Sequence, residues 1–169
     1  VIREHAERRG KKIMYAFNIS DSIDAMRRHH DLVLEAGGSC VMVSLNSLGL
    51  PAVEHLRRHA ALPIHGHRNG WGQLTRHPLL GIEFPAYQKL WRLAGVDHIH
   101  VNAIDNKFWE PNDSVVRSLE STLAPFLGGF EIMPVLSSGQ WGGQAFETWA
   151  SCRTTDVIYL AGGGIMAHP

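Results

Sequence analysis

The chain has 169 residues, 44% hydrophobic and 19% charged, which is the composition of one globular domain with a core. Basic and acidic residues both number 16, so no basic surplus neutralises a phosphate backbone and we expect no nucleic-acid partner. No apolar run approaches the roughly 18 residues of a membrane span and no signal peptide is recognisable, so we expect a cytoplasmic protein without a membrane partner. Cys40 and Cys152 lack metal-ligand spacing, and Cys40 is expected to be a reduced core residue.

In chain order, the sequence predicts strands and helices in alternation. Val1–Gly10 reads as a charged helix closed by glycine. Strands are predicted where short apolar runs end in polar residues or glycine, at Lys12–Asn18, Cys40–Asn46, Leu62–His67, Val96–Val101, Glu131–Leu136 and Asp156–Leu160. Helices are predicted between them, at about residues 20–36, Leu50–Ala60, Glu83–Ala94, Ser114–Phe126 and Gly143–Cys152.

This alternation predicts an α/β fold with a parallel sheet, either an open doubly wound sheet or a TIM barrel. An open sheet concentrates functional residues at one switch point, whereas every predicted strand here ends in polar residues or glycine. That ring of polar strand ends favours the (β/α)8 barrel. A whole barrel has eight strands and about 250 residues, so we expect residues 1–169 to be part of a barrel.

Two predicted strands each carry a pair of histidines. His65 and His67 alternate with Gly66 and so share a face, as do His98 and His100. Zinc hydrolases built on barrels use such pairs as ligands, and the alternative is that one histidine of each pair is a hydrogen-bonded structural residue. The last strand carries glycines where the hydrolase needs a carboxylate, which counts against zinc.

Glycine and serine end the last two predicted strands. Gly162-Gly163-Gly164 and Ser137-Ser138-Gly139 can expose backbone N–H groups to a phosphate, which barrel enzymes hold after their last strands. Arg68 could hold a second anion. Lys107, followed by Phe108 and Trp109, lies in a predicted loop that either folds over the site as a lid or leaves a solvated surface lysine.

Five segments together resemble the RuBisCO large-subunit superfamily, and most closely its RuBisCO-like, form IV members. These are KIMYAFNIS, IHGHRNGWG, DHIHVNAIDNK, MPVLSSGQ and AGGGIMAHP. The resemblance runs the length of the chain and implies strands three to eight of that family's catalytic barrel, with the N-terminal domain and first strands not included. The carbamylated lysine and the acids that bind Mg2+ in the family would lie before Val1, so no metal ligand is expected within this chain. A homodimer is also expected.

The resemblance implies roles for eight residues. His67 matches the catalytic histidine of strand five, His100 the histidine of strand six, and Lys107 the lysine of mobile loop six. The phosphate-binding residues would be Arg68, Ser137, Gly139, Gly162 and Gly163.

Departures from the family pattern indicate a different reaction from CO2 fixation. The loop lysine lies in Asp-Asn-Lys-Phe-Trp-Glu-Pro, Trp71 replaces a histidine, and the seventh strand continues as SSGQW. The family's shared chemistry is a magnesium-held enediolate on a phosphorylated substrate. We expect a carboxy-lyase of the 3-oxo-isoapionate 4-phosphate decarboxylase type. The alternatives are an isomerase or enolase acting on a 5-methylthioribulose-1-phosphate-type substrate, and a non-catalytic RuBisCO-like protein.

Overall fold

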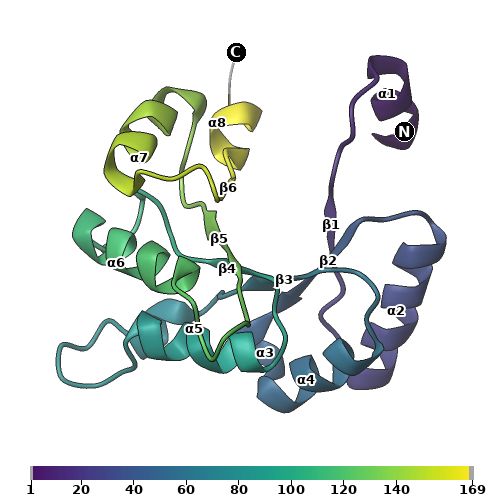
Figure 1. The fold of residues 1–169 in the computed structure, drawn as a ribbon, viewed down its shortest axis with the longest axis horizontal. Helices are drawn as coiled ribbons and strands as arrows, with labels where there is room; N and C mark the ends of the chain where they lie inside the picture. The colour runs from purple at the N-terminus through teal and green to yellow at the C-terminus, as the bar shows by residue number, and fades with distance from the viewer. Residues whose placement is uncertain (1, 168–169) are drawn as a thin grey trace.

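A computed structural model describes residues 2–167 and shows one curved sheet of six parallel strands flanked by helices (Figure 1). The strands are β1 (Ala16–Asn18), β2 (Cys40–Ser44), β3 (Ile64–His67), β4 (His98–His100), β5 (Met133–Leu136) and β6 (Ile158–Tyr159). They pair in sequential order from β1 to β6, and all five pairings are parallel. The order never reverses, as it would in a doubly wound sheet, so the expectation of a partial TIM barrel is confirmed.

The helices follow the predicted alternation. They are α1 (Ile2–Arg9), α2 (Ile23–Glu35), α3 (Leu45–Leu48), α4 (Leu50–His59), α5 (Phe84–Leu93), α6 (Asn112–Leu123), α7 (Ala145–Cys152) and α8 (Gly162–Met166), with 3-10 turns η1 (Trp71–Leu74) and η2 (Gly142–Gln144). No helix within residues 2–167 is long and apolar enough to cross a membrane. Val1, His168 and Pro169, which belong to the predicted first helix and the last motif, lie outside the described residues.

Each of the six predicted strands is two to four residues longer than the strand in the structure, and the largest difference is at β1. The predicted strand at Lys12–Asn18 pairs only over β1, because β1 is the edge of this sheet and has a single neighbour. Asn46 does not end a strand, since α3 begins directly after Ser44 and includes it. Asn46 still lies on the same side of the sheet as the strand ends, because its Nδ2 donates to the Asn69 carbonyl at 3.0 Å.

The core lies between the sheet and its helices. Val41, Val43, Ile64, Ile99 and Val135, on four neighbouring strands, are completely buried. β2 is buried on both faces, as its continuous apolar run predicts. Cys40 and Cys152 are free and buried, as expected of Cys40 as a reduced core residue.

Gly66, between the two histidines of β3, gives a prediction about packing. A Cβ there would lie 2.8 Å from Val96 Cγ1 and 2.9 Å from Leu45 Cδ1, inside van der Waals contact on both sides. We expect Gly66→Ala to lower the free energy of unfolding of the full-length protein by about 1–3 kcal/mol, measured in denaturant. The control is Gly129→Ala, because a Cβ at Gly129 meets nothing within 4 Å. Equal stabilities of the two variants would show that close packing does not exclude a side chain from position 66.

Candidate active site

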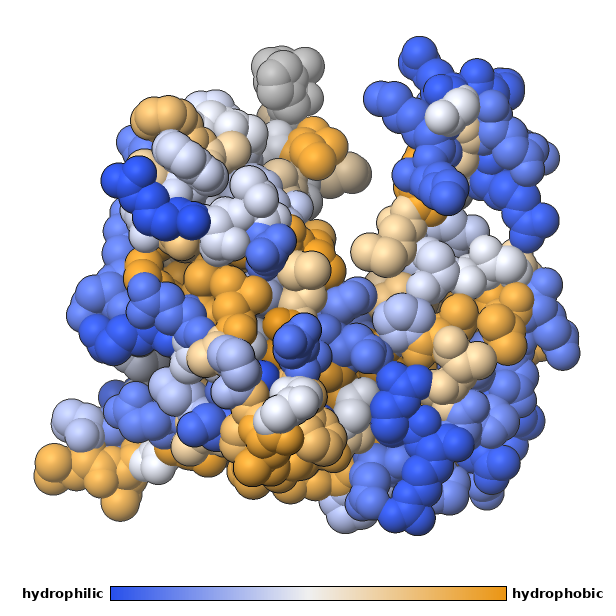
Figure 2. Space-filling view, viewed as in Figure 1, coloured by the Kyte–Doolittle hydropathy of each residue, from blue (hydrophilic) through white to orange (hydrophobic). Residues whose placement is uncertain are grey.

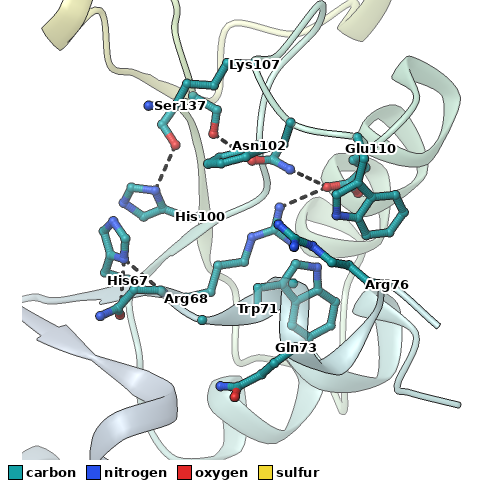
Figure 3. A pocket seen from close by; sticks show the side chains of 16 residues that line it. His67, Arg68, Trp71, Gln73, Arg76, His100, Asn102, Lys107, Glu110 and Ser137 are labelled. Carbon is teal, nitrogen blue, oxygen red and sulfur yellow. Dashed lines mark hydrogen bonds and ion pairs between the residues drawn. The ribbon is translucent and has the colours of Figure 1, made fainter.

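A cavity of about 720 Å³ opens at the carboxyl ends of β3, β4 and β5 (Figure 3). Residues from the three segments that follow these strands line it, namely residues 67–73 and 76, residues 100, 102 and 107–110, and residues 137–138. The structure therefore brings together five of the predicted site residues, which are His67, Arg68, His100, Lys107 and Ser137. This end of the strands is where barrel enzymes place their active sites.

The three predicted phosphate-binding glycines do not line this cavity. Gly139 has a positive φ of 86° and lies against Lys107, whose Cβ would be 3.3 Å from a Cβ at Gly139. Gly162 and Gly163 open α8, whose first hydrogen bond runs from Ile165 N to Ala161 O, so their own N–H groups precede it. The two glycine segments are neighbours, since a Cβ at Gly164 would lie 2.9 Å from the Gln140 carbonyl oxygen. Phosphate binding by these glycines stays a prediction.

Arg68 forms the buried floor of the cavity (Figure 3). Its side chain is 5% exposed, and its guanidinium carbon lies 5.3 Å from the Trp71 ring centroid and 4.8 Å from that of Phe84. Nη2 donates to Glu110 Oε2 at 3.1 Å, whereas Nη1 is buried and has no hydrogen-bond partner among the described residues. Burial lowers the Arg68 pKa and Glu110 opposes that shift. The pairing with Glu110 engages one N–H of Nη2 and leaves Nη1 without a partner.

Glu110 and Asn102, which the sequence analysis did not single out, organise the wall beside Arg68. Glu110 Oε2 also accepts from Asn102 Nδ2, and Oε1 accepts from Ser114 Oγ at 3.0 Å. Asn102 Oδ1 accepts from Ser138 Oγ at 2.7 Å. The sequence gives little indication of this role. Glu110 is a single carboxylate after Phe108 and Trp109 in a loop, and Asn102 is one of several polar residues that follow a strand.

His100 is fixed on both ring nitrogens. Its Nε2 lies 2.8 Å from His65 Nε2, and its Nδ1 lies 2.9 Å from Ser137 Oγ. Burial lowers the pKa of His65 to about 4 and that of His100 to about 2, so both rings are neutral near pH 7. With both nitrogens engaged, His100 presents no free ring nitrogen to the cavity.

His67, at the end of β3, keeps one nitrogen open. Its Nδ1 accepts the Asn69 backbone N–H at 3.0 Å, so the neutral ring carries its proton on Nε2. The His67 and His100 ring centroids are 4.3 Å apart. Burial lowers the pKa of His67, against a smaller opposing effect of the Asn69 side chain. His67 thus offers an Nε2–H donor at the cavity.

The buried histidine pair predicts a pH dependence of stability. Below the ordinary histidine pKa of 6.5, His65 and His100 bind protons in the unfolded chain but stay unprotonated in the folded protein. Unfolding free energy should therefore fall with decreasing pH by up to about 1.4 kcal/mol per pH unit for each histidine. Denaturant titrations between pH 6.5 and 4.5 should show a shallower fall for His65→Gln. The control is His55→Gln, at an exposed histidine of α4. An unchanged slope in His65→Gln would contradict this assignment.

Lys107 lies on a loop whose backbone is hydrogen-bonded to neighbouring segments and whose side chains at residues 107–109 are exposed. Its backbone N–H donates to the Ser138 carbonyl at 3.1 Å, and Asn106 Nδ2 bridges the carbonyls of Ala103 and Glu110. The side chain is exposed, with Nζ 5.5 Å from the Phe108 ring centroid. Phe108 and Trp109 are 54% and 51% exposed at the cavity rim, a placement consistent with the predicted lid.

Among the described residues, the histidine pairs of β3 and β4 do not bring three potential ligand atoms together. Within residues 2–167, only His30, Asp31 and His59 bring three potential ligand atoms within 4.8 Å of one another. His30 Nε2 accepts the N–H groups of Ala61 and Leu62, so its proton sits on Nδ1 and is donated to Asp31. This triad therefore joins α2, α4 and the segment before β3, and its hydrogen bonds leave no lone pair at His30 Nδ1 for a metal.

The cavity itself offers no free carboxylate for Mg2+. Its one acidic side chain, Glu110, already accepts hydrogen bonds from Arg68, Asn102 and Ser114. Mg2+ prefers carboxylate oxygens and phosphates. The described residues at the cavity thus do not by themselves fit this metal, and the position of its ligands stays a prediction.

Neutral imidazoles, a buried arginine and a lysine-bearing loop at the carboxyl ends of parallel strands define a barrel enzyme site. The family model for the ribulose bisphosphate carboxylase large chain, catalytic domain, matches residues 1–169, so the chain belongs to this family.

Two curated relatives are similar over essentially the whole chain. A Xanthobacter autotrophicus protein named 3-oxo-isoapionate-4-phosphate transcarboxylase/hydrolase is 56% identical over 100% of this chain and 41% of its own length. A Rhizobium rhizogenes protein named 3-oxo-isoapionate-4-phosphate decarboxylase is 49% identical over 99% of this chain and 41% of its own. The chain thus spans about two fifths of the relatives it matches.

A solved structure confirms the fold. The crystal structure of a rubisco-like protein from Burkholderia fungorum superposes with a TM-score of 0.94 at 47% identity. The match covers 99% of this chain and 42% of the other.

Proposed function

We propose that this chain forms part of the catalytic barrel of a carboxy-lyase that acts on a phosphorylated 3-oxo sugar acid. The observation that carries the proposal is the joint placement of Lys107, His67 and Arg68 on one cavity. The names of the relatives at 56% and 49% identity support this substrate class. Decarboxylation needs a cation near the carboxylate, a donor for the developing oxyanion, and a proton for the carbon, and Lys107 and His67 are the groups proposed for the first two.

In the proposed reaction the bond between the carboxylate carbon and the α-carbon breaks, and its electron pair moves toward the 3-oxo group. CO2 leaves, and the former carbonyl oxygen becomes an enediolate oxyanion. Lys107 Nζ holds the carboxylate before it leaves, and the His67 Nε2–H donates a hydrogen bond to the oxyanion. A proton from solvent water then adds to the α-carbon, and the enediolate oxygen becomes a carbonyl again. Uncharged imidazoles suit this role because they donate without competing for the carboxylate.

Mg2+ is the proposed cofactor, and it would supply positive charge at the enediolate when bound. Because Glu110 is engaged, we propose that its ligands lie outside residues 2–167. We propose that the substrate's phosphate binds at Gly139, Gly162 and Gly163, beside the Lys107 loop.

A homodimer in the cytoplasm is also proposed. The loop between η1 and α5 projects from the body in Figure 1, and apolar side chains mark it in Figure 2. Leu79 and Leu80 on this loop are 85% and 72% exposed, which is a surface that a partner subunit could cover.

The test is turnover of a panel of pentulose phosphates and oxo-acid phosphates by the full-length protein, with and without Mg2+. We expect CO2 release from a 3-oxo-acid phosphate, lost on chelation. Isomerisation or enolisation without CO2 release would replace the lyase with the isomerase or enolase alternative. No turnover of any substrate would favour a binding protein.

A further inference from the structure

We propose that Glu110 is a specificity-determining residue that makes the Arg68 end of the cavity a site for a neutral hydroxyl or carbonyl oxygen. The consequence is that the protein takes monophosphates and gains no affinity from a second phosphate. This inference rests on the proposed function for the general class of substrate, a phosphorylated sugar derivative.

The first observation is how firmly the Glu110 carboxylate is held. Three donors converge on it: Arg68 Nη2 at 3.1 Å, Asn102 Nδ2, and Ser114 Oγ at 3.0 Å. They come from the segments after β3 and β4 and from α6. The Glu110 side chain is 6% exposed. A carboxylate bound by three donors in a buried wall stays in place while a ligand enters.

The second observation concerns the N–H groups of Arg68 that do not pair with Glu110. Recognition of phosphate by arginine typically uses two parallel N–H groups of the guanidinium fork. Here Nη2 is committed to Glu110, and the guanidinium lies against the Trp71 and Phe84 rings, so it cannot turn freely. Nη1 is buried and unpartnered, and it shares the guanidinium with the nitrogen that pairs with Glu110, so an oxygen that accepts from Nη1 lies close to the Glu110 carboxylate.

The third observation is the charge of this wall. Arg68 and Glu110 cancel, His67 and His100 are uncharged, and Ser137 and Asn102 are neutral. The other cations on the cavity, Lys107 and Arg76, are exposed at its rim. A phosphate dianion beside Nη1 would face the Glu110 carboxylate at close range in a poorly hydrated site, where like charges repel strongly. A hydroxyl or carbonyl oxygen accepts the same N–H without that cost.

The predicted phosphate-binding residues therefore divide into two groups that contact opposite ends of the substrate. Arg68 and Ser137, whose Oγ lies 2.9 Å from His100 Nδ1, serve the uncharged end of the substrate. The single phosphate goes to the end formed by Gly139 and the glycines that open α8.

The test compares two ligands that differ by one phosphate, ribulose 5-phosphate and ribulose 1,5-bisphosphate, by calorimetric titration of the full-length protein. We expect the wild-type dissociation constants to agree within about threefold. Glu110→Gln keeps the side-chain shape and an acceptor for Ser114 but removes the charge. It should tighten bisphosphate binding by about tenfold or more, because a hydrogen-bonded ionic contact is gained, and leave the monophosphate nearly unchanged.

The control is Glu54→Gln, which removes the carboxylate paired with Arg58 on the exposed face of α4 and should change neither constant. Bisphosphate binding at least tenfold tighter than monophosphate binding in the wild type would overturn the proposal, because a phosphate would then displace Glu110. An equal gain for both ligands in Glu110→Gln would overturn it as well. The wild-type comparison needs no variant and decides the matter if Glu110→Gln fails to fold. Both measurements are made without turnover, so a failed decarboxylation assay leaves them intact.

Discussion

Lys107→Met in the full-length protein is expected to lower kcat by about 10²–10³-fold on a substrate that loses CO2. The variant keeps the length of the side chain and removes the charge that holds the departing carboxylate. The substitution leaves the proposed phosphate site at the glycines and the Arg68 side chain unchanged, so KM should move far less than kcat. Steady-state assays of CO2 release measure both constants.

Lys89→Met is a closely matched control. Lys89 is exposed and lies 5.6 Å from the Phe126 ring centroid, as Lys107 lies 5.5 Å from that of Phe108, but it is on α5 away from the cavity. We expect wild-type kcat and KM for it. An isomerase or enolase predicts a mild effect at Lys107, because no carboxylate leaves in those reactions. A mild effect together with retained isomerisation would therefore contradict the lyase.

The topology could be predicted because β/α repetition leaves its mark on every segment. Apolar runs of strand length alternate with amphipathic helices, and parallel neighbours collect their polar ends at one edge. The alternation of His65 and His67 likewise predicted their shared face, and both rings lie close to His100. Asn46 was misplaced because the turn from β2 into α3 contains neither glycine nor proline to mark it.

The wall around Arg68 could not be predicted, because its key contact joins residues 42 positions apart. Nothing local distinguishes Glu110 from a solvated loop carboxylate, and burial of its charge depends on donors from two strand ends and a helix. The position of Gly162 and Gly163 outside the cavity is also a tertiary outcome. It follows from how α8 packs on Gln140 and Trp141, which the glycine pattern alone does not reveal.

His67→Asn is expected to lower kcat by about 10²–10³-fold, comparably to Lys107→Met. The His67 Nε2–H is the open imidazole donor at the cavity, since both nitrogens of His100 are engaged. Asparagine keeps polarity but is too short to place a donor at the same point. Burial lowers the pKa of His67, so the ring is already neutral at pH 7 and the loss is that of a neutral donor, not of a charge. The deficit should accordingly persist from pH 7 to pH 8.

His77→Asn is the matched control. Like His67, His77 accepts a backbone N–H on Nδ1 from the residue two positions later, here Leu79 at 3.1 Å. Unlike His67, it does not line this cavity. It should retain the wild-type rate. Loss at His67 is common to the lyase and the isomerase alternative, since both stabilise an enediolate oxyanion, so Lys107 separates them and His67 tests catalysis itself. Rates equal to wild type for both His67→Asn and Lys107→Met, on a substrate that the wild type converts, would remove these residues from the chemistry. If the wild type converts nothing either, the cavity is that of a binding protein. The neutral wall around Arg68 and Glu110 then favours a ligand with an uncharged oxygen at that end.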